Sequence, residues 1–287
     1  MKHQEQIFPA SEWLELDPES LHGLTIMLGE TDSGKTSLTR WLAQAMAATR
    51  APTAWIDGDI GQSCLGVPST MNLAFMDQNS PMPPKVKTSY FIGSTNAAGN
   101  FLPIVTGLKR LVERALSSLE RKVILDTTGF VAVASGGLEL KKWKIELLQP
   151  RTVISLQRDN ELEPVLTPLR KQTRIRIIDI ALSPRTRKKS REQRVRNRRK
   201  KFQEYFKDAR EVNFYIPDLP VYDLHLARRL SLMGLLDEQG FCLALGSVLD
   251  KTDRQIKIAT PWKDQDGVAG LRVGRIRIDP STGIELA

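Results

Sequence analysis

Cysteine and long apolar runs are scarce in this chain of 287 residues. Only Cys64 and Cys242 occur, far apart and without a CxxC or a histidine at ligand spacing, which excludes a disulfide framework and the usual zinc sites. No apolar run approaches the ~18 residues of a membrane span. The first residues, 1–6, lack the charged head and apolar core of a secretory leader. We therefore expect a cytoplasmic protein with no membrane partner and two buried thiols.

The positive charge of the chain is concentrated in one segment. The net charge is +9, yet the stretch from Arg185 to Lys201 alone holds eleven Lys or Arg against Glu192, a local charge of +10. The rest of the chain therefore sums to −1. A uniformly basic surface would favour general adhesion to nucleic acid, whereas one basic run beside a phosphate site favours the gripping of particular phosphates.

The segment from Gly29 to Ser37 matches the phosphate-loop pattern GxxxxGK[ST]. It lies between an apolar run, 24–28, and an amphipathic helical pattern, 36–48. In this setting backbone N–H groups surround phosphate oxygens, Lys35 reaches the β and γ phosphates, and Thr36 offers its hydroxyl to Mg²⁺. A glycine turn with an incidental lysine is the alternative. The predicted triphosphate site comprises Gly29, Glu30, Thr31, Asp32, Ser33, Gly34, Lys35, Thr36 and Ser37.

Strand and helix patterns alternate through the first two thirds of the chain. Apolar strands are expected at 53–56, 88–93, 122–126, 152–156 and 174–182, and helices at 101–119, 137–148 and 161–169. This alternation predicts an α/β fold of the P-loop NTPase kind, with a parallel sheet covered by helices on both faces.

The character of the sequence changes after residue 211. A helical pattern at 224–236 precedes short β-like runs at 241–245, 256–259, 271–273 and 275–278, separated by Gly, Asp and Pro. We expect a P-loop core at 1–211 and a small β-rich domain at 212–287.

Carboxylates follow two strands that are expected beside the phosphate loop. Asp57 and Asp59 follow the strand 53–56, and Asp126 ends the strand 122–126. Carboxylates at this edge can hold Mg²⁺ or receive an incoming nucleophile. An Asp-Gly turn is the alternative for the first pair. The sequence leaves open whether Asp59 or Asp126 lies nearer the metal.

The basic segment, about 185–206, reads as a helix whose two ends differ. One stripe of a helical wheel contains Arg191, Arg194, Val195, Arg198, Phe202, Tyr205 and Phe206. The aromatic end can pack down while the arginine end projects, which is the arrangement of a lid over a transferring phosphate. A solvated charged helix is the alternative.

Five features in the same order resemble the polynucleotide 5′-hydroxyl kinase family, which includes the kinase subunit of the eukaryotic mRNA cleavage and polyadenylation machinery and the pre-ribosomal RNA processing kinases. They are the phosphate loop, DxDxGQ at 57–62, FxGxT at 91–95, TxGF at 127–130 and the arginine-rich helix. The resemblance covers roughly residues 20–210. It implies transfer of the γ-phosphate of ATP, with Mg²⁺, to the 5′-OH of RNA or DNA.

The resemblance also implies roles for the matching residues. The catalytic residues would be Lys35, Asp59, Arg191, Arg194 and Arg198. The substrate-binding residues would be Asp57, Gln62, Thr95, Thr127, Gly129 and Phe130. The metal-binding residues would be Thr36, Asp59, Gln62 and Asp126. Asp59 would orient and activate the 5′-hydroxyl, the two threonines would grip the terminal phosphodiester, and the arginines would neutralise the γ-phosphate. The threonines could instead cap turns, and Phe130 could be a core residue.

Two departures from the family pattern bear on the substrate. The family usually has Trp where this chain has Phe130, a smaller stacking platform without a hydrogen-bond donor. The large N-terminal β domain of the eukaryotic members is missing, which favours a compact prokaryotic enzyme. Two other functions stay open: an ATP-binding RNA-processing scaffold without transfer, and a small-molecule kinase whose basic helix only closes over ATP. The sequence does not distinguish RNA from DNA, and it does not say whether the protein works alone.

Overall fold

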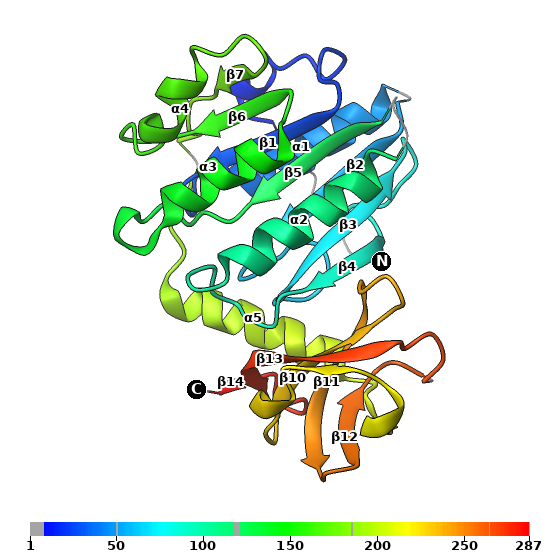
Figure 1. Ribbon diagram of the computed structural model, residues 1–287. Coiled ribbons are helices and arrows are strands. Elements are labelled where there is room, and N and C mark those ends of the chain that lie inside the picture. Colours follow the sequence, from blue (N-terminus) through cyan, green and yellow to red (C-terminus); the bar gives the residue numbers. More distant parts are fainter. Residues whose placement is uncertain (1–8, 50, 118–120, 185, 264, 287) are drawn as a thin grey trace. The chain divides into compact units, whose positions relative to one another are not determined.

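The computed structural model describes residues 9–49, 51–117, 121–184, 186–263 and 265–286. The described chain divides into two compact units, which are treated separately below (Figure 1). The first unit contains the residues up to Asp59 together with 72–87 and 97–189, and the second contains 60–71, 88–96 and the residues from Ser190 onward. The basic helix and two short earlier segments therefore group with the C-terminal strands. The domain boundary expected at residue 211 stays a prediction.

A largely parallel sheet forms the centre of the first unit (Figure 1). Its order is β3-β2-β5-β1-β6-β7, and all neighbours are parallel except β3, which runs antiparallel to β2. Every residue of β1, β2, β5 and β6 is buried, and the centre of each strand is apolar, as expected for parallel strands covered on both faces. The bounds are β1 Leu24–Gly29, β2 Thr53–Gly58, β3 Thr70–Met76, β5 Lys122–Thr127, β6 Thr152–Leu156 and β7 Arg176–Asp179.

Helices cover this sheet, with α2 and α3 in front of it and α1 behind it in Figure 1. The α/β fold class expected from the alternating pattern is thus confirmed. The helix expected at 101–119 ends at Ala115, and Leu119 lies outside the described residues. No helix in the described part of the chain has the length and apolar character of a membrane span. The helices are η1 Ser11–Trp13, α1 Lys35–Ala48, α2 Phe101–Ala115, η2 Val133–Ser135, α3 Gly137–Leu148 and α4 Glu163–Leu169.

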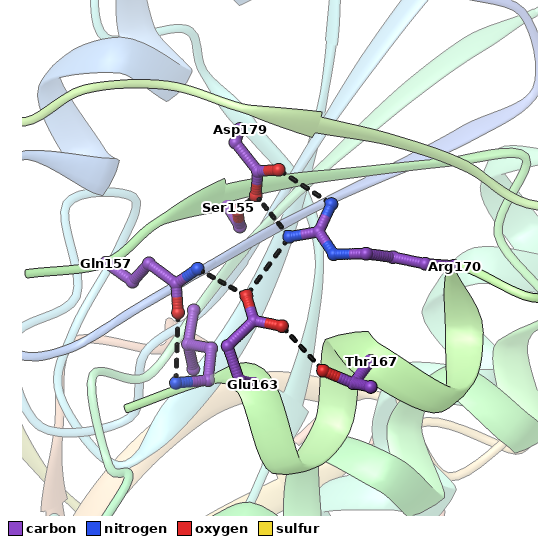
Figure 2. A network of polar contacts seen from close by, with 7 residues as sticks. Ser155, Gln157, Glu163, Thr167, Arg170 and Asp179 are labelled. Carbon is purple, nitrogen blue, oxygen red and sulfur yellow. Dashed lines mark hydrogen bonds and ion pairs between the residues drawn. The ribbon is translucent and has the colours of Figure 1, made fainter. Parts of the chain in front are cut away.

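A polar network fastens the edge strand β7 to α4 (Figure 2). The Arg170 guanidinium donates to both oxygens of Asp179, at 2.7 and 3.0 Å, and to Glu163 at 3.1 Å. Hydrogen bonds from Gln157 and Thr167, together with Arg170, lower the pKa of Glu163 to about 2. The network thus holds β7 beside β6 at the edge of the sheet. The last residue of β6, Leu156, is the register partner of Gly29, where the phosphate loop begins.

Antiparallel strands and one long helix, α5, form most of the second unit. β10 pairs with β11 and β13, and β12 pairs with β11 and β8. The apolar residues of these strands form two buried clusters, one of which also contains Phe202 and Phe206 of α5. Ser89 of β4 pairs with Cys242 of β11. The elements are β4 Val86–Phe91, α5 Arg191–Phe206, β8 Arg210–Tyr215, η3 Ile216–Asp218, β9 Val221–Tyr222, η4 Leu224–Leu226, β10 Ser231–Leu236, β11 Cys242–Lys251, β12 Gln255–Thr260, β13 Gly270–Ile278 and β14 Glu285–Leu286.

The helix predicted at 224–236 is wrong. The structure has a short 3₁₀ turn, η4, and then the strand β10, every residue of which is buried. A short apolar run buried on both faces has no period that separates helix from strand. Gly234 within it indicates close approach instead, because a Cβ there would lie 2.6 Å from Cγ of Phe91.

Candidate functional site

The phosphate loop joins β1 to α1 in a path that requires glycine. A Cβ at Gly29 would lie 2.6 Å from the Leu156 carbonyl oxygen. Gly34, the N-cap of α1, has φ +92°, in the left-handed region that favours glycine. The first N–H groups of α1 have no partner within the helix, so together with the helix dipole they form an anion-binding site. The loop thus has the geometry that the sequence predicts for phosphate binding.

Lys35 lies within this loop and is 5% exposed. Its ammonium donates to the Glu30 carbonyl oxygen at 2.5 Å and to Oγ of Ser33 at 3.3 Å. Burial lowers the pKa of Lys35, while the carboxylates of Asp126 and Asp59 oppose that shift. The cation therefore lies between the phosphate loop and two carboxylates, Asp126 of β5 and Asp59 after β2.

Asp126 is the carboxylate that contacts the loop directly. The Thr36 hydroxyl donates to its Oδ2 at 2.6 Å, whereas its buried Oδ1 has no hydrogen-bond partner among the described residues. Burial, and then the charge of Asp57, raise the pKa of Asp126 to about 7. An unpartnered carboxylate oxygen beside a hydroxyl fits Mg²⁺, which prefers oxygen ligands and keeps several waters. Of the two carboxylates that the sequence leaves open, the contact with Thr36 favours Asp126.

Two further carboxylates lie at the end of the neighbouring strand: Asp57 is within β2, and Asp59 directly follows it. Asp57 is fully buried and is the register partner of Asp126, so the two carboxylates end adjacent parallel strands. Its Oδ1 accepts a hydrogen bond from the Asp59 backbone N–H at 3.0 Å. Asp59 follows the strand and is half-buried, which leaves its side chain accessible to a substrate. The arrangement gives one enclosed carboxylate and one accessible carboxylate.

Two buried lysines on α3 are site residues that sequence reasoning missed. Lys141 is 1% exposed and its ammonium donates to the Thr128 carbonyl oxygen at 3.0 Å. Lys144 is fully buried, and its ammonium has no hydrogen-bond partner in the described part of the protein. Burial lowers the pKa of Lys144 to about 8 against the opposing charges of Asp59 and Asp126. The signal in the sequence is their spacing of three, which places both on the apolar stripe of α3 with Leu138 and Leu148.

The TxGF segment begins at the last residue of β5 and packs against the phosphate loop. Thr127 is buried, and its hydroxyl donates to the Met27 carbonyl oxygen at 2.7 Å, which favours a structural role. A Cβ at Gly129 would lie 2.4 Å from Cα of Thr31, so glycine is required by this close approach. Phe130 is half-buried and its ring lies 6.2 Å from that of Phe101. The substrate-binding roles expected for these residues stay predictions.

The basic segment is divided between the two units. Residues 186–189 belong to the first, where the Lys189 backbone N–H donates to Oδ2 of Asp32 in the phosphate loop at 2.8 Å. In the second unit, α5 begins after Ser190, which forms a capping box with Gln193. Arg185, the expected start of the segment, lies outside the described residues.

The lid arginines differ in exposure along α5. Arg191 is exposed, whereas Arg194 and Arg198 are half-buried toward the anchored end, where Phe202 and Phe206 are buried. Gln62 donates through its Nε2 to the Arg194 carbonyl oxygen at 3.3 Å. The structure therefore brings Gln62 to the backbone of α5 within the second unit.

A carboxylate that the sequence did not single out lies between two of the predicted site residues. Glu285 accepts hydrogen bonds from the Thr95 hydroxyl at 2.8 Å and from Nε of Arg198 at 3.1 Å. The three residues come from segments far apart in the sequence. No local pattern could predict their contact.

Comparisons with known proteins identify the family. The family model described as the P-loop of mRNA cleavage and polyadenylation factor CLP1 matches residues 29–208. The polyribonucleotide 5′-hydroxyl-kinase of Pyrococcus abyssi is 29% identical over 314 residues, covering 88% of this chain and 87% of that protein. The protein of the same description from Methanocaldococcus jannaschii is 28% identical over 317 residues, covering 88% and 86%.

A solved structure shows the same fold. The structure described as the wild-type Clp1p–Pcf11p complex contains a chain that matches with a TM-score of 0.66 at 13% identity, covering 90% of this chain and 75% of that one. The match to the family model extends over more than half of the chain and confirms the resemblance drawn from the sequence. The chain belongs to the CLP1 P-loop family.

Proposed function

We propose that this chain is an ATP- and Mg²⁺-dependent polynucleotide 5′-hydroxyl kinase that transfers the γ-phosphate of ATP to the 5′-OH end of RNA. The observation that carries the proposal is the contact between Thr36 of the phosphate loop and Asp126, with Asp57 on the neighbouring strand and Asp59 directly after it. The curated relatives named polyribonucleotide 5′-hydroxyl-kinases support the choice of acceptor. DNA ends are a second acceptor to be tested.

The proposed mechanism assigns one task to each group of the first unit. The amides of the phosphate loop and Lys35 bind the β and γ phosphates. Thr36 and Asp126 hold Mg²⁺, which when bound neutralises charge on the phosphate oxygens. Asp59 orients the 5′-hydroxyl and accepts its proton late, as the bond from the hydroxyl oxygen to phosphorus forms and the bond to the ADP oxygen breaks.

The second unit contributes cations in this proposal. Arg191, Arg194 and Arg198 neutralise charge on the transferring phosphoryl group, as the resemblance implies. Gln62 is held at the α5 backbone and would act through the position of that helix. We place the enzyme in the cytoplasm, as the sequence suggests.

Two other functions are distinguished by one labelling assay. The protein is incubated with ATP that carries a radioactive γ-phosphate, in the presence of 5′-OH RNA, 5′-OH DNA, nucleosides and sugars in separate reactions. Label on the oligonucleotide is the expected result. Label on none of these acceptors would support a nucleotide-binding scaffold, and label only on nucleosides or sugars would support a small-molecule kinase. Lys35→Ala serves as the control for phosphate transfer by a contaminant.

A further inference from the structure

Glu285 of β14 forms two hydrogen bonds, one with each carboxylate oxygen. Oε1 accepts from the Thr95 hydroxyl at 2.8 Å, and Oε2 accepts from Nε of Arg198 at 3.1 Å. The Arg198 and Glu285 side chains are 21% and 26% exposed, so the pair is largely withdrawn from water. A single carboxylate thus joins the FxGxT segment to the arginine helix within the second unit.

The backbone holds all three residues in place. β14 pairs with the end of β13, with Glu285 opposite Ile278. The turn before β14 packs onto α5, because a Cβ at Gly283 would lie 2.2 Å from the Arg199 carbonyl oxygen, and Nε of Arg199 donates to the Thr282 carbonyl oxygen at 3.1 Å. On the other side, the Gly93 carbonyl oxygen accepts from the Arg275 backbone N–H at 2.8 Å. Backbone contacts of the β-sheet and of α5 therefore hold Thr95, Arg198 and Glu285 in position.

The hydrogen bonds to Glu285 determine which donor groups of Arg198 and Thr95 are left to bind a substrate. Arg198 uses its Nε, and neither of its Nη atoms has a hydrogen bond among the described residues, so the outer edge of the guanidinium can bind a phosphate in two-pronged geometry. Thr95 has one hydroxyl proton, and that proton is donated to Glu285. While this bond persists, Thr95 cannot donate to a phosphodiester.

We infer that Glu285 and Thr95 are positioning residues for Arg198. Thr95 orients the Glu285 carboxylate, and that carboxylate fixes the Arg198 side chain so that its Nη edge is presented to the phosphate of a bound substrate. Thr95 then acts on the arginine and not on the RNA, in contrast to the clasp role that the resemblance implies. The inference rests on the proposed function, because it takes Arg198 as the residue that binds the transferring phosphoryl group.

The test is a double-mutant cycle on RNA phosphorylation. Thr95→Val removes the hydroxyl at nearly constant shape, and Glu285→Gln removes the charge. We expect each to lower kcat by about tenfold, within the range that misplacement of a catalytic group costs, with KM for RNA unchanged. The double variant should be no slower than Glu285→Gln alone, because both act through one chain of contacts. Thr95→Ser should restore the rate.

Two controls make the outcome specific. Glu211→Gln removes an exposed carboxylate of the same unit, which pairs with Lys257 at 3.3 Å, and should leave kcat unchanged. Thermal unfolding of each variant separates loss of position from loss of fold. A Thr95→Val enzyme with raised KM for RNA, additive losses in the double variant, or faster transfer by Glu285→Gln would overturn the inference. Absence of transfer by the unmodified protein would instead contradict the proposed function.

Discussion

The charged side chains of the two units differ in how far they are exposed to solvent. In the first, five ionisable residues near the phosphate loop are enclosed: Lys35, Asp57, Asp126, Lys141 and Lys144 are at most 5% exposed. In the second, most charged residues of α5 are exposed; Arg199 donates to one backbone carbonyl and Arg198 to one carboxylate. Enclosed charges act as preorganised groups in a medium of low dielectric constant, whereas the exposed cations of α5 can adapt to a charge that arrives with the substrate. Arg198, which Glu285 holds, is the exception on this helix.

This difference predicts where substitutions act. A change in the enclosed cluster should alter the chemical step and the pH dependence of stability together, because each charge there is desolvated and coupled to the next. A change on α5 should alter the rate while leaving the fold intact, since its apolar anchor, Phe202 and Phe206, is separate from its arginines. Four predictions test this division, in order of decreasing expected effect.

Loss of the enclosed cation Lys35, or of the accessible carboxylate Asp59, should abolish transfer. Lys35→Ala and Asp59→Asn are each expected to lower kcat by at least about a thousandfold, because phosphoryl transfer depends on electrostatic stabilisation and on a positioned nucleophile. Circular dichroism and thermal unfolding should show an intact fold. Appreciable turnover by Asp59→Asn would move the base role to Asp57 or Asp126.

Loss of a lid arginine should slow chemistry more than it weakens binding. Arg198→Ala is expected to lower kcat by about a hundredfold or more, since loss of one preorganised group that stabilises transition-state charge costs on that scale. Affinity for RNA, measured by fluorescence anisotropy, should change little. Arg196→Ala, an exposed position on the same helix, is the matched control. A loss confined to RNA binding would make α5 a docking surface, and the comparison between the units would no longer hold.

Lys144→Met should distinguish the effect of a buried cation on stability from its effect on catalysis. It replaces a desolvated ammonium by a side chain of similar length, so the free energy of unfolding should be unchanged or higher. We expect kcat to fall by about tenfold, because Asp59 and Asp126 lose a neighbouring positive charge. Lys142→Met, on the exposed face of the same helix, should change neither quantity. Full activity in Lys144→Met would reduce this lysine to a structural residue.

The raised pKa of Asp126 predicts how stability depends on pH. An unfolded aspartate has a pKa of about 3.8, and the folded value is about 7, so the folded state binds the proton more tightly. In the absence of nucleotide and metal, the contribution of Asp126 to stability should therefore fall as pH rises from 4 to 7 and stay constant above. Urea titrations should show a smaller decline for Asp126→Asn over this window. An identical decline in the two proteins would show that Asp126 is not the titrating group.

The bounds of an element can be predicted from the sequence where neighbouring residues determine them. The phosphate loop, β6 and α3 begin and end within a residue of their expected bounds, because glycine positions and hydrophobic period determine them directly. The anchored end of α5 follows in the same way from its aromatic stripe. The order of elements and the family were predictable for these reasons.

Long-range contacts account for what the sequence does not predict. The strand β10 has a helix-like apolar run, and only its burial on both faces determines its conformation. Lys141 and Lys144 look like surface lysines until the apolar stripe of α3 places them inside. The contact of Glu285 with Thr95 spans 190 residues, and its partner Arg198 lies 87 residues away. Such pairs are set by the packing of the whole unit.

One measurement tests the central claim most directly. Two RNA oligonucleotides of the same sequence, one with a 5′-OH and one with a 5′-phosphate, are incubated in single-turnover reactions with ATP labelled at the γ-phosphate. The account predicts label on the 5′-OH oligonucleotide, with none on its 5′-phosphorylated twin or in reactions with Lys35→Ala. Equal labelling of the two oligonucleotides, or labelling of neither, would contradict it.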